Sequence, residues 1–125
     1  MSAPRTVTVA TVDFGAVTLP EPGWCEGHEA EPEYRVDVTH RSTDQLLYLP
    51  VHQDEAELLN IGFEERPFTS RWPGTSPFVS VGFGGDHYPT DVPGLHAMAA
   101  ELERHAAVLR DYAERLAALL AGGGR

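Results

Sequence analysis

The longest regular pattern in the chain is LHAMAAELERHAAVLRDYAERLAALL, residues 95–120. This stretch contains neither proline nor glycine, Asp91 precedes it as an N-cap residue, and Gly122 follows it as a stop signal. Its apolar residues recur at spacings of three and four, which predicts one long amphipathic helix with a seven-residue repeat. The apolar row consists of Leu95, Met98, Leu102, His105, Leu109, Tyr112, Leu116 and Leu119.

This helix is long for a chain of 125 residues. At a rise of about 1.5 Å per residue it extends roughly 39 Å, whereas a six-residue strand spans only about 20 Å. The simplest use of the apolar row is packing on the chain's own sheet, but part of the row should extend past that sheet. We therefore also expect a protein partner, or a second copy of the chain, to bind at Leu102, His105, Leu109, Tyr112 and Leu116.

Five shorter segments ahead of the helix have the alternation or composition of β-strands: 6–12, 34–40, 46–51, 57–64 and 78–83. Pro50 favours an edge position for its segment. The residues between the first two segments, 13–33, are rich in proline and glycine, which predicts a structured loop. Residues 53–56 are predicted to form a polar turn, and residues 84–89 to lead from the last strand into the helix.

These elements predict an α+β fold, in which a mostly antiparallel sheet of four to six strands packs against one long C-terminal helix. The chain length suits a single domain, residues 1–125. Its expected parts are a strand-rich region at 6–83 that includes the loop 13–33, the helix at 91–121, and a flexible tail at 122–125.

Composition narrows the range of functions. The formal net charge is −10, and all nine basic residues are arginine, which argues against nucleic-acid binding because that requires a basic surface. No apolar run is long enough to cross a bilayer, so no membrane partner is expected. The first residues lack the apolar centre of a signal peptide, which leads us to expect a cytoplasmic protein. The single cysteine cannot form a disulfide within the chain.

The residues best suited to binding a metal or carrying out chemistry are in Trp24-Cys25-Glu26-Gly27-His28 and at His40. A cysteine and a histidine two residues apart can both point inward from one tight turn, and Gly27 gives that turn its freedom. His40, at the end of a predicted strand, would complete the group. These ligand types predict a zinc site at Cys25, His28 and His40, with Asp37 as a further candidate ligand.

Three ligands leave the character of the site open. A structural zinc site usually has four protein ligands, whereas a catalytic site keeps a position for water. Alternatively, Cys25 is a small buried apolar residue and both histidines are satisfied by hydrogen bonds. A third interpretation is a cysteine nucleophile assisted by His28 and Asp37, although no flanking signature supports it.

Three segments together resemble a known family: residues 5–9, Pro22-Gly23-Trp24-Cys25-Glu26-Gly27-His28, and Asp37-Val38-Thr39-His40-Arg41-Ser42. The chain resembles small actinobacterial proteins, found also in phages and mobile elements, that are catalogued as a domain of unknown function. The resemblance extends to the late apolar strand and the Ala/Leu-rich helix. Members often have Cys-Pro-x-Trp-Cys where this chain has Glu21-Pro22-Gly23-Trp24-Cys25. The resemblance therefore implies that Glu21 stands in for a lost cysteine, as an oxygen ligand.

We accordingly expect a small cytoplasmic binding or adaptor protein, stabilised by zinc, that is more a binding protein than an enzyme. The first alternative is a metal-dependent hydrolase-like enzyme that uses Cys25, His28 and His40 with an open coordination position. The second, motivated by the net charge, is an acidic decoy of a nucleic-acid-binding protein.

Overall fold

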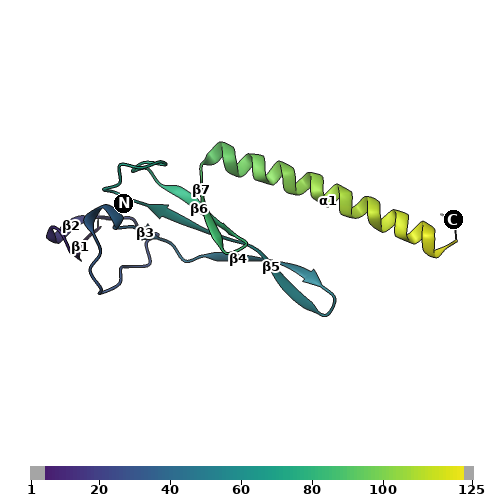
Figure 1. Cartoon of the computed structure of the whole chain (residues 1–125), viewed down its shortest axis with the longest axis horizontal. Helices are drawn as coiled ribbons and strands as arrows, with labels where there is room; N and C mark the ends of the chain where they lie inside the picture. The colour runs from purple at the N-terminus through teal and green to yellow at the C-terminus, as the bar shows by residue number, and fades with distance from the viewer. Residues whose placement is uncertain (1–4, 123–125) are drawn as a thin grey trace. The chain divides into compact units, whose positions relative to one another are not determined.

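The computed structural model describes residues 5–122, which divide into two units that meet between Thr90 and Asp91. The first contains all the strands of the described residues, and the second is the C-terminal helix (Figure 1). Of the expected tail at 122–125, only Gly122 lies within the described residues.

The first unit begins with a hairpin of β1 (Arg5–Thr11) and β2 (Gly15–Glu21), paired antiparallel along their whole length. Gly15 closes the turn at φ 66°, a conformation that glycine adopts without strain. The Thr11 hydroxyl donates to the Gly15 carbonyl at 2.7 Å and accepts from the Phe14 N–H at 3.0 Å. The prediction of a loop at 13–33 was therefore wrong over Gly15–Glu21, because Ala-Val-Thr-Leu at 16–19 alternates as a strand.

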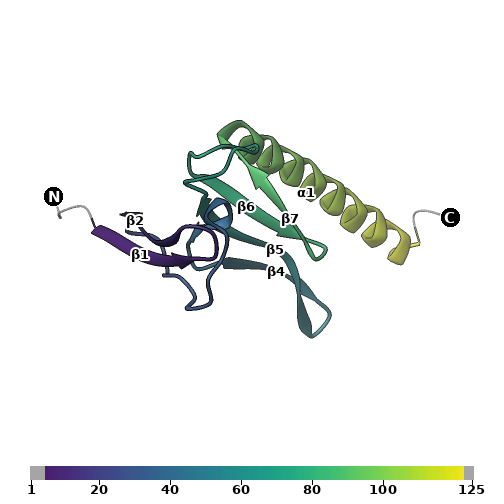
Figure 2. The ribbon, with the colours of Figure 1, turned by 60° about the vertical axis from the view of Figure 1, so that its left-hand side comes forward.

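The second sheet has five strands: β3 (His40–Arg41), β4 (Gln45–Val51), β5 (Asp54–Glu65), β6 (Phe78–Phe83) and β7 (Asp86–Thr90). β5 is its central strand. One side of β5 pairs with β4 along its first part and with β3 at Glu64 and Glu65, and the other side pairs with β6 only from Asn60 to Glu64. Figure 2 shows β4 to β7 side by side in this order. All neighbouring strands are antiparallel.

The core of this unit is concentrated on β6, where five of six residues are buried. The buried apolar residues of the first unit are Leu19, Cys25, Val38, Leu59, Phe78, Val79 and Val81. Trp24 contacts Phe63 of β5, with ring centroids 5.9 Å apart, and so attaches the loop after β2 to the sheet. The loop and the sheet therefore share one packed interior.

Two predicted segments differ from the structure, and for 34–40 the reason is that alternation can also arise in a turn. Residues 34–40 are not a strand. Arg35–Asp37 is a 3₁₀ turn in which the Asp37 N–H donates to the Tyr34 carbonyl at 2.9 Å, and only His40–Arg41 joins the sheet. The predicted polar turn at 53–56 is shorter, since the chain reverses at His52 (φ 41°) and β5 begins at Asp54.

The strand β7 was missed because Pro89 and two glycines suggested a connection to the helix. Gly84 and Gly85, both at positive φ, instead form a tight hairpin turn, as Gly-Gly pairs commonly do. Pro89 is tolerated because β7 is an edge strand of the sheet. Strands 6–12, 46–51, 57–64 and 78–83 are confirmed, with end points that shift by up to three residues.

Gly82 of β6 lies opposite Asn60 of β5, and a β-carbon at this glycine would collide with the Asn60 side chain. We expect Gly82→Ala to lower the free energy of unfolding of the first unit by about 1–3 kcal/mol. Urea unfolding followed by tryptophan fluorescence measures this, because both tryptophans belong to that unit. Adding Asn60→Ala should restore part of the loss. Gly23→Ala, where a β-carbon meets nothing, serves as the control.

The second unit contains α1 (Val92–Leu120), whose start and end match the prediction closely. The Asp91 carboxylate accepts a hydrogen bond from the Gly94 N–H at 2.9 Å, and Gly122, at φ 82°, donates its N–H to the Leu119 carbonyl at 3.0 Å. The α+β class with antiparallel strands and one long C-terminal helix is thus confirmed. Within residues 5–122, no helix is both long enough and apolar enough to span a bilayer.

Candidate metal centre

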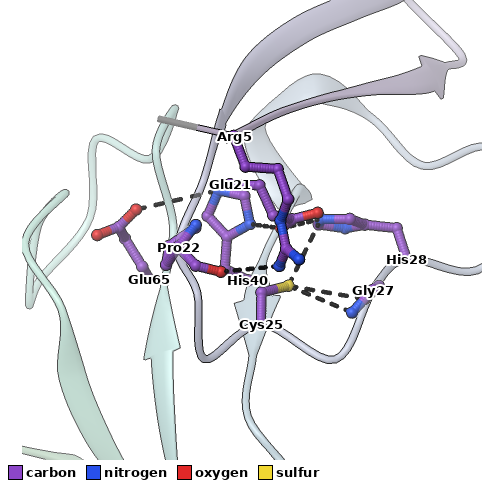
Figure 3. A network of polar contacts seen from close by, with 8 residues as sticks. All are labelled: Arg5, Glu21, Pro22, Cys25, Gly27, His28, His40 and Glu65. Carbon is purple, nitrogen blue, oxygen red and sulfur yellow. Dashed lines mark hydrogen bonds and ion pairs between the residues drawn. The ribbon is translucent and has the colours of Figure 1, made fainter. Parts of the chain in front are cut away.

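Four side chains with metal-ligating atoms meet in the first unit (Figure 3). Glu21 is the last residue of β2, Cys25 and His28 belong to the loop that follows, and His40 is the first residue of β3. One ligand atom of each residue lies within 4.8 Å of the corresponding atoms of the others. The structure therefore brings together the three predicted ligands and the glutamate implied by the family resemblance.

The loop places Cys25 and His28 through backbone hydrogen bonds. The Cys25 N–H donates to the Pro22 carbonyl at 3.0 Å, and the Glu26 N–H donates to Arg41 of β3 at 2.8 Å. Gly27, at φ 107°, lets the chain turn back so that its own N–H points to the Cys25 sulfur at 3.4 Å. The sulfur then lies 3.8 Å from Nε2 of His28. A turn within the loop and one hydrogen bond to β3 together form this half of the cluster.

Glu21 connects the two histidines. Its Oε1 lies 3.1 Å from Nε2 of His28 and 2.8 Å from Nδ1 of His40, and its side chain is only 7% exposed. Burial by itself would raise the pKa of this carboxyl. Hydrogen bonds with Cys25 and His28, together with the charges of both imidazoles, outweigh burial and hold the pKa below its usual value. Glu21 therefore presents an ionised carboxylate oxygen to the cluster.

His40 is fully buried, and its hydrogen bonds are not satisfied. Its Nδ1 is close to the Glu21 oxygen but lacks hydrogen-bond geometry, and its Nε2 lies 4.0 Å from Oε1 of Glu65. Among the described residues neither ring nitrogen has a hydrogen-bond partner. Buried polar atoms without partners are rare because each loses its hydration without compensation. A cation in the cluster would use one of these nitrogens as a ligand.

The Cys25 thiol is held in its protonated form in the absence of a cation. Burial and the hydrogen bond to Glu21 both raise the pKa of this thiol, and backbone hydrogen bonds oppose them only in part. A divalent cation reverses this balance, because it binds the thiolate and displaces the proton. Proton and metal therefore compete for the same sulfur.

The donor set suits zinc. One sulfur, two imidazole nitrogens and one carboxylate oxygen are the ligand types that zinc accepts in tetrahedral sites. A thiolate and a carboxylate also neutralise the two positive charges of the ion, which favours a buried position. The residues present thus fit a four-coordinate divalent metal ion.

The residues around the cluster differ from the predicted set at Asp37 and Glu65. Asp37 does not join the cluster, because it belongs to the 3₁₀ turn Arg35–Asp37 and not to a strand that ends at His40. Glu65 was not predicted; it pairs with His40 across β3 and β5 and brings its carboxylate close to Nε2 of His40. Such an outer carboxylate orients a ligating histidine. Only the strand register, which the sequence does not show, could have indicated it.

The residues predicted to bind a partner lie in α1, away in sequence from the metal cluster. Leu109, Tyr112 and Leu116 are each more than half exposed, and the side chains of His105 and Glu101 approach to 3.7 Å on the helix surface. The apolar row is therefore accessible to solvent at these positions.

The span matched by a family model includes the cluster and the apolar row of α1 from Leu95 to Leu116. The model described as Domain of unknown function (DUF6907) matches residues 6–118 of the chain. No curated protein and no solved structure matches the chain. Since the match covers most of the 125 residues, the chain belongs to the family described as Domain of unknown function (DUF6907).

Proposed function

We propose that this is a small cytoplasmic binding protein whose first unit is stabilised by a structural zinc ion held by Glu21, Cys25, His28 and His40. The observation that carries the proposal is the buried imidazole of His40, whose nitrogens have no hydrogen-bond partner among the described residues and which faces three further ligands. A cytoplasmic location fits a site that needs its only thiol reduced.

Four convergent side chains favour a structural role over catalysis. A hydrolytic zinc site keeps one coordination position for water, and three protein ligands suffice for it. Here Glu21 fills the fourth position, and both it and His40 are at least nine-tenths buried. The raised pKa of Cys25 also opposes a role as nucleophile, which requires the thiolate.

The expected effect of the ion on the fold follows from where its ligands lie. Glu21 ends the β1–β2 hairpin, His40 begins the shortest strand of the five-stranded sheet, and the other two ligands come from the loop between them. A bound ion ties these three segments to one point. β3 has only two residues, and a bound ion adds a further fixed point to its pairing with β5.

Metal removal tests the proposal. Protein purified from zinc-supplemented cells should contain one zinc per chain by elemental analysis, and a strong chelator should destabilise the first unit and lower its urea midpoint. Trp24 reports that change through its fluorescence, because it precedes Cys25 and contacts Phe63. Added zinc should restore the signal, and magnesium should not, because it prefers oxygen ligands.

Other outcomes would contradict the proposal in distinct ways. Protein without stoichiometric zinc, even after incubation with the metal, would exclude the site. Bound zinc whose removal leaves the fluorescence and the urea midpoint unchanged would reject the structural role. If that protein also hydrolysed ester or phosphoester substrates only in its zinc-loaded form, the hydrolase alternative would replace it.

A further inference from the structure

The apolar row of α1 has the spacing of a coiled-coil seam. Eight residues recur with strictly alternating steps of three and four over Leu95–Leu119, and none of the 29 residues of the helix is buried. Leu109 is 69% exposed and Tyr112 is 60% exposed. A regular seam of this length, left in water, is typical of a helix that pairs with another helix.

We propose that α1 pairs with α1 of a second copy of this chain, in an antiparallel two-stranded coiled coil whose two-fold axis passes beside Val108. This proposal concerns the second unit and does not depend on zinc. Only one antiparallel alignment of the two helices both pairs every residue of the apolar row and brings opposite charges together beside it.

The core layers are the first argument for this register. The seam has two kinds of position in each seven-residue repeat. The first is occupied by leucine (Leu95, Leu102, Leu109 and Leu116), and the fourth by Met98, His105, Tyr112 and Leu119. In an antiparallel coiled coil each first-position residue faces a fourth-position residue of the opposite helix. With the axis beside Val108, all eight seam residues find a counterpart and neither end overhangs. The layers are Leu109 with His105, Tyr112 with Leu102, Leu116 with Met98, and Leu119 with Leu95.

The charged flank of the seam is the second argument. Glu101, Val108 and Arg115 precede successive leucines of the seam and lie on one flank. In the proposed register Glu101 meets Arg115 of the second copy, Arg115 meets Glu101, and Val108 meets its own counterpart. Shifting the antiparallel register by one heptad places Arg115 against Val108 and loses both ion pairs. Opposite charges across such a flank select orientation and register.

The other flank permits close approach. It is formed by Ala99, Ala106, Ala113 and Leu120, and its three alanines present only methyl groups to the opposite helix. A parallel dimer would instead place Glu101 beside Ala106 and Arg115 beside Leu120, and would stack His105 against its own counterpart. Such a dimer has no ion pair between its helices. The sequence of the flanks therefore favours the antiparallel arrangement.

The charged residues are available for these pairs. Within its own helix Glu101 contacts Arg104 at 3.1 Å, and Arg115 contacts Asp111 at 3.8 Å. All four side chains are at least half exposed, and such surface ion pairs contribute little to stability. Glu101 and Arg115 can therefore turn toward a second copy at small cost.

Sedimentation equilibrium of the full chain, with and without added zinc, tests the dimer. We expect a species of twice the 13.7 kDa chain mass at micromolar concentration. Leu109→Glu should raise the dimer dissociation constant by about a hundredfold or more. Ala107→Glu, on the opposite side of the helix, is the matched control and should leave the constant unchanged. Far-UV circular dichroism and tryptophan fluorescence verify that both variants remain folded. A monomeric wild-type chain would overturn the proposal.

Charge exchange and cross-linking test the register. Glu101→Arg alone and Arg115→Glu alone should each weaken the dimer, and the two together should restore it. Val108→Cys should form a disulfide-linked dimer under mild oxidation, whereas Ala107→Cys should not. A dimer in which Val108→Cys fails to cross-link, or in which the double exchange gives no recovery, would reject the antiparallel register. Neither result would bear on the zinc site.

Discussion

Replacing His40 with leucine should abolish stoichiometric zinc binding and lower the free energy of unfolding of the zinc-loaded first unit by about 4 kcal/mol or more. The reason is that loss of a metal ligand removes binding energy that the folded state alone receives. His40 is the fully buried member of the cluster. Elemental analysis gives the zinc content, and urea unfolding monitored by tryptophan fluorescence gives the stability.

The same variant should behave differently without metal. In chelator the wild-type protein retains two buried ring nitrogens without hydrogen-bond partners, and leucine removes both while filling much of the same space. We therefore expect His40→Leu to cost much less stability in metal-free protein, where only the loss of the close contact with the Glu21 carboxylate remains, than in zinc-loaded protein. An equal loss of stability with and without zinc would mean that His40 is a packing residue and not a ligand.

Asp37→Asn provides the matched control for this series. Asp37 lies three residues before His40, carries a metal-ligating side chain, and does not belong to the cluster. Its replacement should leave zinc content unchanged. A loss of zinc in this variant would contradict the ligand set that the structure indicates.

Replacing Glu21 with cysteine should increase zinc affinity by at least about tenfold and raise the unfolding midpoint of the zinc-loaded protein. A second thiolate is a softer donor than a carboxylate and converts the site to two cysteines and two histidines, a common structural zinc set. Competition against a chromophoric chelator under reducing conditions measures the affinity. Substitution with cobalt adds a direct count of ligands, since sulfur-to-cobalt charge-transfer absorption grows with the number of thiolates.

Glu26→Cys is the control for that gain. Glu26 belongs to the same loop but lies outside the cluster, so it adds a thiol without adding a ligand. Its affinity for zinc and its cobalt spectrum should match those of the wild type. If Glu21→Cys showed the same single-thiolate spectrum as Glu26→Cys, Glu21 would not be a ligand.

The sequence was sufficient for features that depend on neighbouring residues. The helix, its Asp91 cap and its stop near Gly122 all follow from local chemistry, and so does the close approach of Cys25 and His28 around Gly27. His40 joined the prediction through ligand type, and the structure brings it to the other ligands.

Features that depend on pairing between distant segments were not accessible. Glu65 reaches His40 only because β3 and β5 are in one specific register. β2 was hidden by the prolines around it, and the 3₁₀ turn at Arg35–Asp37 was mistaken for a strand because Val36 and Val38 alternate with polar residues. Alternation reports which side chains share a side, and a tight turn can produce the same pattern.

The first part of β5 is paired with a neighbouring strand on one side only, and this has a consequence for self-association. β6 pairs with β5 only from Asn60 onward, so the residues before it carry β4 on one side and no partner strand of the described chain on the other. Exposed backbone of this kind invites strand addition and growth into fibrils. Asp54, Glu55 and Glu57 lie on that half of β5 and are exposed. A second molecule approaching in the same way would bring an identical set of carboxylates, and their mutual repulsion protects the open rim of the sheet.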